Sequence, residues 1–181
     1  NGVVNLINHM PPERFRHAVI ALAQCAPDFC QRGQRADVEF ISLHKPPGHG
    51  IKLYPRFYRL CRQLRPAIVH TRNLAALEFA VPAALADVPA RVHGEHGWDT
   101  SDPGGTQRKY QLLRRAYSPF VNRDVALSGQ IESYLPERVG TAASRVERIC
   151  NGVDTLRFQP ASTRQAVAGS PFYESDVVVG T

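Results

Sequence analysis

The segment His93-Gly94-Glu95-His96-Gly97-Trp98-Asp99 concentrates the residue types that do chemistry. Two imidazoles, two carboxylates and an indole stand beside two glycines, which let the backbone turn and approach a ligand closely. A positioned histidine donates a hydrogen bond to a hydroxyl group or exchanges a proton with it, and we expect His96 to act in this way. The alternative is a polar turn in which the histidines cap the neighbouring backbone. We favour ligand binding for the whole group, His93, Gly94, Glu95, Gly97, Trp98 and Asp99.

Two other chemistries do not fit these residues. A zinc site of the His-Glu-x-x-His type is excluded, because His93 and His96 are three residues apart. A serine esterase is excluded, because the sequence contains no Gly-x-Ser-x-Gly. The cysteines also lack metal-type spacing, and we expect reduced thiols and no metal site at Cys25, Cys30, Cys61 and Cys150.

The segment His70-Thr71-Arg72-Asn73 is a second candidate. A guanidinium such as that of Arg72 can bind a phosphate or a carboxylate in a bidentate manner, and for Arg72 we give equal weight to this role and to a purely structural one. Asn73 stands where it can cap the following helix, and this role competes with ligand binding. Ser128 and the pair Asn151-Gly152 follow two further apolar runs, and we include them in the substrate-binding group.

Short apolar runs alternate with helical patterns, which predicts an α/β fold with a Rossmann-like parallel sheet and helices on both faces. We expect strands at 16–22, 38–43, 67–70, 90–93, 124–127 and 146–150, and helices at 1–9, 56–64, 74–86, 109–117 and 131–135. Ligands bind at the carboxyl ends of parallel strands. The candidate residues all follow predicted strands, so we expect them to share one edge of the sheet.

The composition of the chain limits the classes of partner that we expect. The chain has 181 residues, of which 43% are hydrophobic and 21% charged, with a net charge of +6, so we expect anionic partners. Arg56, Arg59, Arg62 and Arg65 recur on one predicted helix. They form either a solvated face or a surface for anionic lipid. Nucleic acid is not expected, because the basic residues are not interleaved with aromatic ones in a known module.

Residues 149–160 read Ile-Cys-Asn-Gly-Val-Asp-Thr-Leu-Arg-Phe-Gln-Pro, which predicts a strand, a turn and a short pinned helix. We expect Asp154 to cap this helix, Phe158 to pack on a core, and Pro160 to end the turn. This sequence closely resembles the interdomain segment of family 4 glycosyltransferases of the GT-B fold. The other motifs occur in the order of that family, and their residues are most similar to those of sugar transferases associated with PEP-CTERM/exosortase systems.

The resemblance implies the N-terminal lobe of a GT-B enzyme, lacking its first strand, with acceptor on this lobe and nucleotide-sugar on the other. It implies an acceptor-side lobe at 1–155, then a linker and the first strand (Val177–Val179) of a truncated donor-binding lobe at 156–181. The family's active-site histidine corresponds best to His96, with His93 as the weaker alternative. A chain of this extent is expected to be inactive alone.

The resemblance also implies an activity. It is retaining transfer of a hexosyl group from a nucleotide-sugar to a saccharide or lipid-linked saccharide in exopolysaccharide biosynthesis, with no cofactor and no obligatory metal. The expected location is the cytoplasm, or the inner face of the plasma membrane as a peripheral protein. The alternatives are a GT-B sugar-nucleotide epimerase and a non-catalytic lobe that binds anions or membrane.

Overall fold

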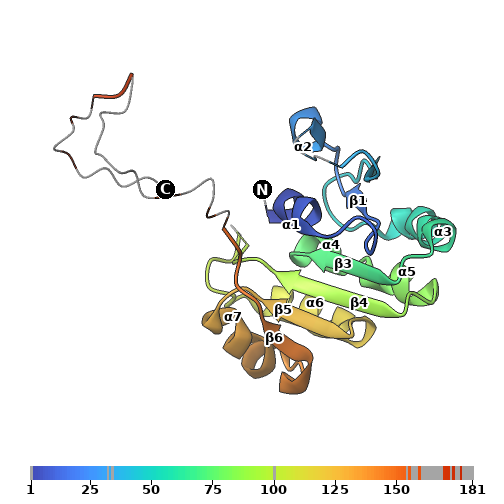
Figure 1. Ribbon diagram of the computed structural model, residues 1–181. Coiled ribbons are helices and arrows are strands. Elements are labelled where there is room, and N and C mark those ends of the chain that lie inside the picture. Colours follow the sequence, from blue (N-terminus) through green and yellow to red (C-terminus); the bar gives the residue numbers. More distant parts are fainter. Residues whose placement is uncertain are drawn as a thin grey trace. The chain divides into compact units, whose positions relative to one another are not determined.

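Strands and helices alternate along the described part of the chain, as the sequence pattern predicts (Figure 1). The computed structural model describes residues 2–31, 33, 35–99, 101–153, 155, 159, 169–171, 173 and 176. The chain divides into two units, Asn1–Asn151 and Gly152–Thr181, and every helix and strand named below lies in the first. The expected roles of Asp154, Phe158 and Pro160, and the strand expected at Val177–Val179, fall outside the described residues.

The main sheet is parallel, with its strands in the order β3 (Ile68–Arg72), β4 (Ala90–Glu95), β5 (Arg123–Ala126) and β6 (Val146–Arg148). The register places Arg72 opposite Gly94 and Glu95 opposite Ala126. The carboxyl ends of these strands therefore lie at one edge, which we call the carboxyl edge (Figure 1). The prediction of an α/β fold with a parallel sheet is confirmed.

A second, separate parallel sheet pairs β1 (Ala18–Ala21) with β2 (Glu39–Ser42). The helix α1 (Gly2–His9) precedes this sheet and the short helix α2 (Pro27–Gln31) connects its strands. Ile20 of β1 and Val69 of β3 pack against the same buried cluster, which consists of Leu43, Phe57, Cys61, Phe79, Ala83, Ala86 and Val88. The two sheets therefore share one hydrophobic core, although their strands are not hydrogen-bonded to each other in the described residues.

The helix α3 (Tyr54–Leu64) contributes Phe57 and Cys61 to this core and exposes its three arginines. Glu78 fixes the entry to this helix, because both of its carboxylate oxygens accept hydrogen bonds from the Gly50 amide, at 2.8 and 3.0 Å. A left-handed residue, Arg65, ends the helix with φ of 46°. The predicted amphipathic helix is thus present, and its start is fixed by a carboxylate 28 residues further along the chain.

One predicted helix is divided in two. The helix expected at 74–86 consists of α4 (Leu74–Leu77) and α5 (Ala80–Leu85), separated by a turn. Pro82 explains the break, because it lacks the amide that would bond to the carbonyl of Glu78 and its ring clashes with that carbonyl. Val81 donates to the Glu78 carbonyl instead, at 3.3 Å.

The last two helices follow β4 and β5 along the chain. The helix α6 (Arg108–Tyr117) lies close to its predicted position. The helix α7 (Gly129–Tyr134) continues as a π-helical turn, Leu135–Val139, so it is longer than the predicted 131–135 and ends at Gly140 with φ of 84°. In the part of the chain that the structure describes, no helix has the length and apolar character needed to span a bilayer.

Candidate active site at the carboxyl edge

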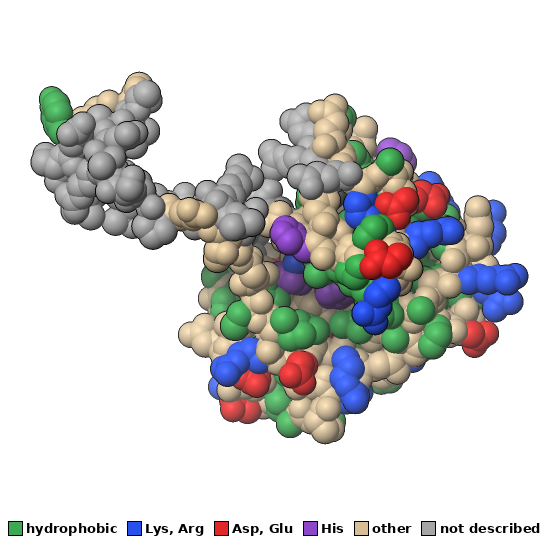
Figure 2. Space-filling model, viewed as in Figure 1, with side chains coloured by type: hydrophobic (Ala, Val, Ile, Leu, Met, Phe, Trp, Pro, Cys, Tyr) green, Lys and Arg blue, Asp and Glu red, His purple; other side chains and the backbone are tan. Residues whose placement is uncertain are grey.

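His70, Arg72, Gly94 and His96 gather where β3 and β4 end. His70 and Arg72 lie two residues apart on β3 and therefore share one face of the sheet. A Cβ atom added to Gly94 would lie 2.7 Å from Nε2 of His96 and 2.9 Å from Nε2 of His70. The missing side chain of Gly94 thus leaves room for both imidazoles. Figure 2 shows histidine side chains gathered close to where Figure 1 shows these strands ending.

Arg72 and His96 form a pair. The Nε atom of Arg72 donates to Nε2 of His96 at 2.8 Å, and Nη2 of Arg72 lies 2.7 Å from Nδ1. Desolvation, followed by the charge of Arg72, lowers the pKa of His96 to about 4. At neutral pH the ring is therefore uncharged, and a base this weak is poorly suited to removing a proton. Hydrogen bonding to a hydroxyl group or anion is the chemistry that this geometry supports best.

Asn73 holds the backbone next to His96. Its Oδ1 accepts a hydrogen bond from the His96 amide at 3.1 Å, and its own amide donates to the Gly94 carbonyl at 2.9 Å. Asn73 precedes α4, but its side chain makes no capping hydrogen bond, so the expected capping role is wrong. Its φ of 60° and ψ of 163° are a combination that residues other than glycine rarely adopt.

Asn151 reaches the same edge from the end of β6. A Cβ atom placed on Gly2, the first residue of α1, would lie 3.8 Å from Nη2 of Arg72 and 4.0 Å from Oδ1 of Asn151. Three separate segments of the chain therefore meet beside the Arg72 guanidinium. The sequence predicts the placement of Arg72, His96 and Asn151 on one edge, but it gives no indication of Gly2.

Two candidate residues lie below this surface. His93 is 1% exposed and Glu95 is 3% exposed, so neither faces the open edge. The ring of His93 lies between Thr71 Oγ1, 2.9 Å from its Nδ1, and Glu95 Oε1, 3.3 Å from its Nε2. Direct contact of His93 or Glu95 with a substrate does not fit this burial. Their hydrogen bonds are made to other parts of the protein.

Arg114 of α6 is the partner of Glu95. Its Nε donates to Glu95 Oε1 at 2.5 Å, and its Nη2 donates to Glu95 Oε2 at 3.2 Å and to Asp99 Oδ2 at 3.3 Å. An arginine on a surface helix is usually exposed, but Arg114 is 4% exposed. The helical pattern of the sequence does not predict the contact of Arg114 with Glu95, which lies 19 positions earlier.

The charge state of Glu95 follows from these neighbours. Burial raises the pKa of a carboxyl group, but hydrogen bonds and charge from His93 and Arg114 outweigh it and lower the pKa of Glu95 to about 2. Asp124 on β5 makes no hydrogen bond through Oδ2, which lies 3.9 Å from Nη2 of Arg145, and burial raises its pKa despite the nearby charges of His93 and Arg145. Glu95 is therefore an ionised carboxylate held inside the protein.

The sequence model of Glycosyltransferase Family 4 matches residues 1–157. The chain belongs to glycosyltransferase family 4. No curated protein matches the chain significantly. The fold and the family agree with the resemblance of the motifs, whereas the closer similarity to PEP-CTERM-associated transferases has no independent support.

Other candidate residues of this family 4 chain have local roles. Trp98 packs edge-to-face on Tyr134 with ring centroids 4.9 Å apart, and Ser128 caps α7 by accepting a hydrogen bond from the Ile131 amide at 3.3 Å. Gly97 is exposed, with φ of 136°. Gly152 begins the second unit of the chain. Among the described residues, no group of three or more His, Cys, Asp or Glu is arranged to hold a metal ion.

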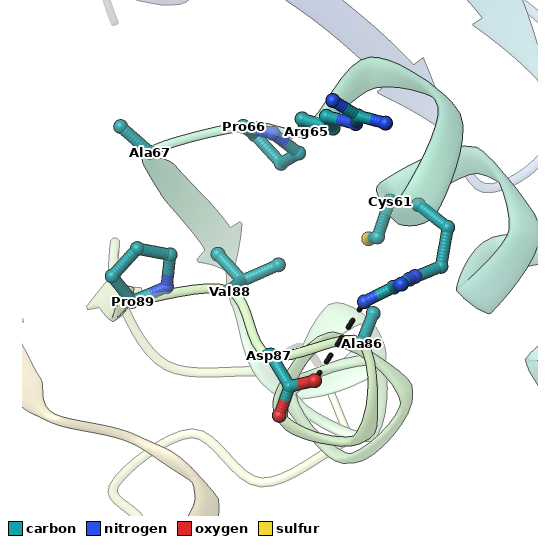
Figure 3. Close-up of a pocket in the computed structure, with 9 residues that line it drawn as sticks. Cys61, Arg65, Pro66, Ala67, Ala86, Asp87, Val88 and Pro89 are labelled. Atoms are coloured by element: carbon teal, nitrogen blue, oxygen red, sulfur yellow. Dashed lines mark ion pairs between the residues drawn. The ribbon is translucent and has the colours of Figure 1, made fainter.

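A hollow lies at the opposite edge of the sheet (Figure 3). Its volume is about 380 Å³, and it is lined by Cys61, Arg62, Arg65, Pro66, Ala67, Ala86, Asp87, Val88 and Pro89. Ala67 and Pro89 directly precede β3 and β4, so this hollow is at the amino ends of the strands. The ion pair between Arg62 and Asp87, 3.7 Å apart, is drawn as a dashed line in Figure 3. The hollow is not part of the candidate site of this glycosyltransferase family member.

Proposed function

We propose that the whole protein transfers a hexosyl group from a nucleotide-sugar to a saccharide or lipid-linked saccharide, with retention of anomeric configuration. The observation that carries this proposal is the Arg72–His96 pair at the carboxyl edge of a family 4 chain. Parallel sheets bind ligands at this edge. A role in exopolysaccharide biosynthesis and the similarity to PEP-CTERM-associated transferases are the finer part of the proposal, and they rest on the motifs alone.

His96 and Arg72 have different roles in this proposal. The neutral His96 orients a sugar hydroxyl by hydrogen bonding and does not act as a general acid, since its lowered pKa leaves the ring uncharged at neutral pH. Arg72 exchanges its contact with His96 for a phosphate or carboxylate oxygen of the substrates. Asn151 adds an amide beside the guanidinium. In this proposal no metal and no cofactor take part, and the nucleotide-sugar binds a second lobe.

Product analysis tests the activity. The whole protein, supplied with nucleotide-sugars and saccharide acceptors, is expected to form a new glycosidic bond that keeps the donor's anomeric configuration. An inverted sugar carbon without a new bond would identify the epimerase instead and overturn the proposal. The 181-residue chain alone is expected to give no turnover, because the proposal assigns the nucleotide-sugar to a second lobe, and turnover by this chain would contradict that assignment.

We further propose that the whole protein works in the cytoplasm as a peripheral protein at the inner face of the plasma membrane. The proposed membrane-binding surface is the segment 51–65, which contains no Asp or Glu. Arg59 and Arg62 are exposed there beside Ile51 and Tyr58, which are 61% and 37% exposed. Arg56 differs, because it donates to the Ser42 and Leu43 carbonyls. Figure 2 shows Lys and Arg side chains on the side where Figure 1 places α3.

Co-sedimentation with vesicles tests this surface. Binding to vesicles with anionic lipid is expected at low salt, and it should fall when Arg59 and Arg62 are both replaced by Gln, because each basic residue contributes about 1 kcal/mol at such a surface. The control is Arg123→Gln, an exposed arginine on β5. Binding that survives both high salt and the double replacement would contradict the proposal.

A further inference from the structure

The turn that carries His96 is short and is held at both ends. Glu95 is the last residue of β4, and Asp99 follows only four positions later. His96, Gly97 and Trp98 lie between these two carboxylates. One side chain from α6, Arg114, donates hydrogen bonds to Glu95 and to Asp99. A single guanidinium thus closes the turn into a loop.

We propose that Arg114 is a positioning residue, which sets the place of His96 by binding the carboxylates at both ends of this turn. The consequence for catalysis rests on the proposed function, whereas the positioning itself does not. Arg114 touches neither His96 nor the open edge, and it acts through the backbone that joins Glu95 to Asp99. Arginine suits this task because its planar fork of donors reaches two carboxylates at once, which an ammonium group on a single stem does poorly.

The packing around Arg114 supports the same role. The guanidinium carbon lies 5.8 Å from the centroid of the Tyr134 ring, and Trp98, inside the turn, packs on that ring at 4.9 Å. Gly105 adjoins both rings, since a Cβ atom there would lie 2.4 Å from Trp98 and 2.7 Å from Tyr134. We call the hydrogen bonds of Arg114 to Glu95 and Asp99 the clamp. Tyr134 therefore supports the turn through its contact with Trp98, and it supports the clamp through its contact with Arg114.

The clamp is also connected to the strand that carries Arg72. His93 lies between Glu95 and Thr71, and Thr71 is the residue before Arg72 on β3. A continuous chain of hydrogen bonds thus runs from α6 through Glu95 and β4 to β3. Both members of the Arg72–His96 pair are fixed from below by one buried network, so displacement of Arg114 should move His96 relative to Arg72.

The test compares Arg114→Lys and Asp99→Asn with Arg115→Lys, a matched control. Arg115 is the next residue of α6, but it donates to the Val139 carbonyl, away from the turn. Amide hydrogen exchange and the NMR signals of the His96 ring report on the turn without any need for activity. We expect exchange at 96–99 to rise by about tenfold or more in the first two variants, the effect of losing a charge-assisted hydrogen bond. The control should exchange at the wild-type rate.

Asp99→Asn keeps the test valid where Arg114→Lys fails to fold. Asp99 is 31% exposed, and the substitution removes the negative charge at only one end of the turn. Unchanged exchange and an unchanged His96 signal in a folded Asp99→Asn variant would overturn the inference. A second readout separates it from the proposed function. In the whole protein, a loosened turn should lower kcat more than it raises KM. A loosened turn with full activity would support the positioning role of Arg114 but refute the catalytic role of His96.

Discussion

At the scale of single residues, the site depends on a neutral histidine beside an arginine. The pKa of His96 is lowered from its usual value of 6.5 to about 4, by desolvation first and by Arg72 second. The unfolded chain therefore takes up a proton at higher pH than the folded one. The stability that the neutral ring contributes is complete above about pH 6.5 and is lost as the pH falls towards 4.

Replacement of Arg72 by Met should raise the pKa of His96, because it removes the positive charge next to the ring. The rise should be partial, since desolvation, the larger cause, remains. An NMR titration of the His96 ring protons measures it, and His9, exposed at the end of α1, is the internal reference. A His96 pKa that is unchanged in the variant would contradict the assigned influence of Arg72.

The limits of sequence reasoning at this scale are visible in β4. The rule that ligands meet the carboxyl ends of parallel strands correctly places Arg72, His96 and Asn151 on one edge. It also offers Glu95 and His93 as surface residues, because the predicted strand ends at residue 93. The real strand continues to Glu95, and α6 covers it with a buried arginine. Contacts between distant segments decide burial, and no local pattern encodes them.

At the scale of elements, Glu78 connects two parts of the fold. It lies in the turn between α4 and α5, is 5% exposed, and accepts both hydrogen bonds from the Gly50 amide. Lys45 lies 3.6 Å from the same carboxylate. The loop before α3 is therefore held by a residue that the broken helix brings into place.

Glu78→Ala should lower the free energy of unfolding by about 1–3 kcal/mol, because it leaves the buried Gly50 amide without its acceptor. Urea denaturation measures this change. The matched control, Glu147→Ala, removes an exposed carboxylate from β6 and should change stability by less than about 0.5 kcal/mol. Equal effects of the two substitutions would show that Glu78 does not hold the loop.

Element boundaries were predictable where one local rule operates and not where two compete. Helix periodicity places α3 and α6 within two residues of their observed starts. The break between α4 and α5 was also encoded, since Pro82 forbids the hydrogen bond to residue 78, but the apolar pattern of 74–86 conceals it. The π-helical extension of α7 has no comparable signal, because it depends on packing of Leu135 and Val139 in the core.

At the scale of the whole molecule, alternation of strands and helices predicts the α/β class and the parallel sheet. The alternation of strands and helices does not predict that the strands form two separate sheets. Contacts between distant segments in the shared core, and not the sequence of any one strand, decide this arrangement. The boundary expected at residue 155 and the partial donor lobe after it stay predictions. The family match, over residues 1–157, concerns almost the same part of the chain as the described fold.

The central claim is that the Arg72–His96 edge is the place where sugar transfer occurs. The most direct measurement is kcat/KM for glycosyl transfer by the whole protein carrying His96→Ala, compared with His9→Ala. We predict a loss of about 100-fold or more for His96→Ala, the effect of losing a group that positions the substrate, and wild-type activity for the control. Wild-type activity in a folded His96→Ala protein would contradict the claim.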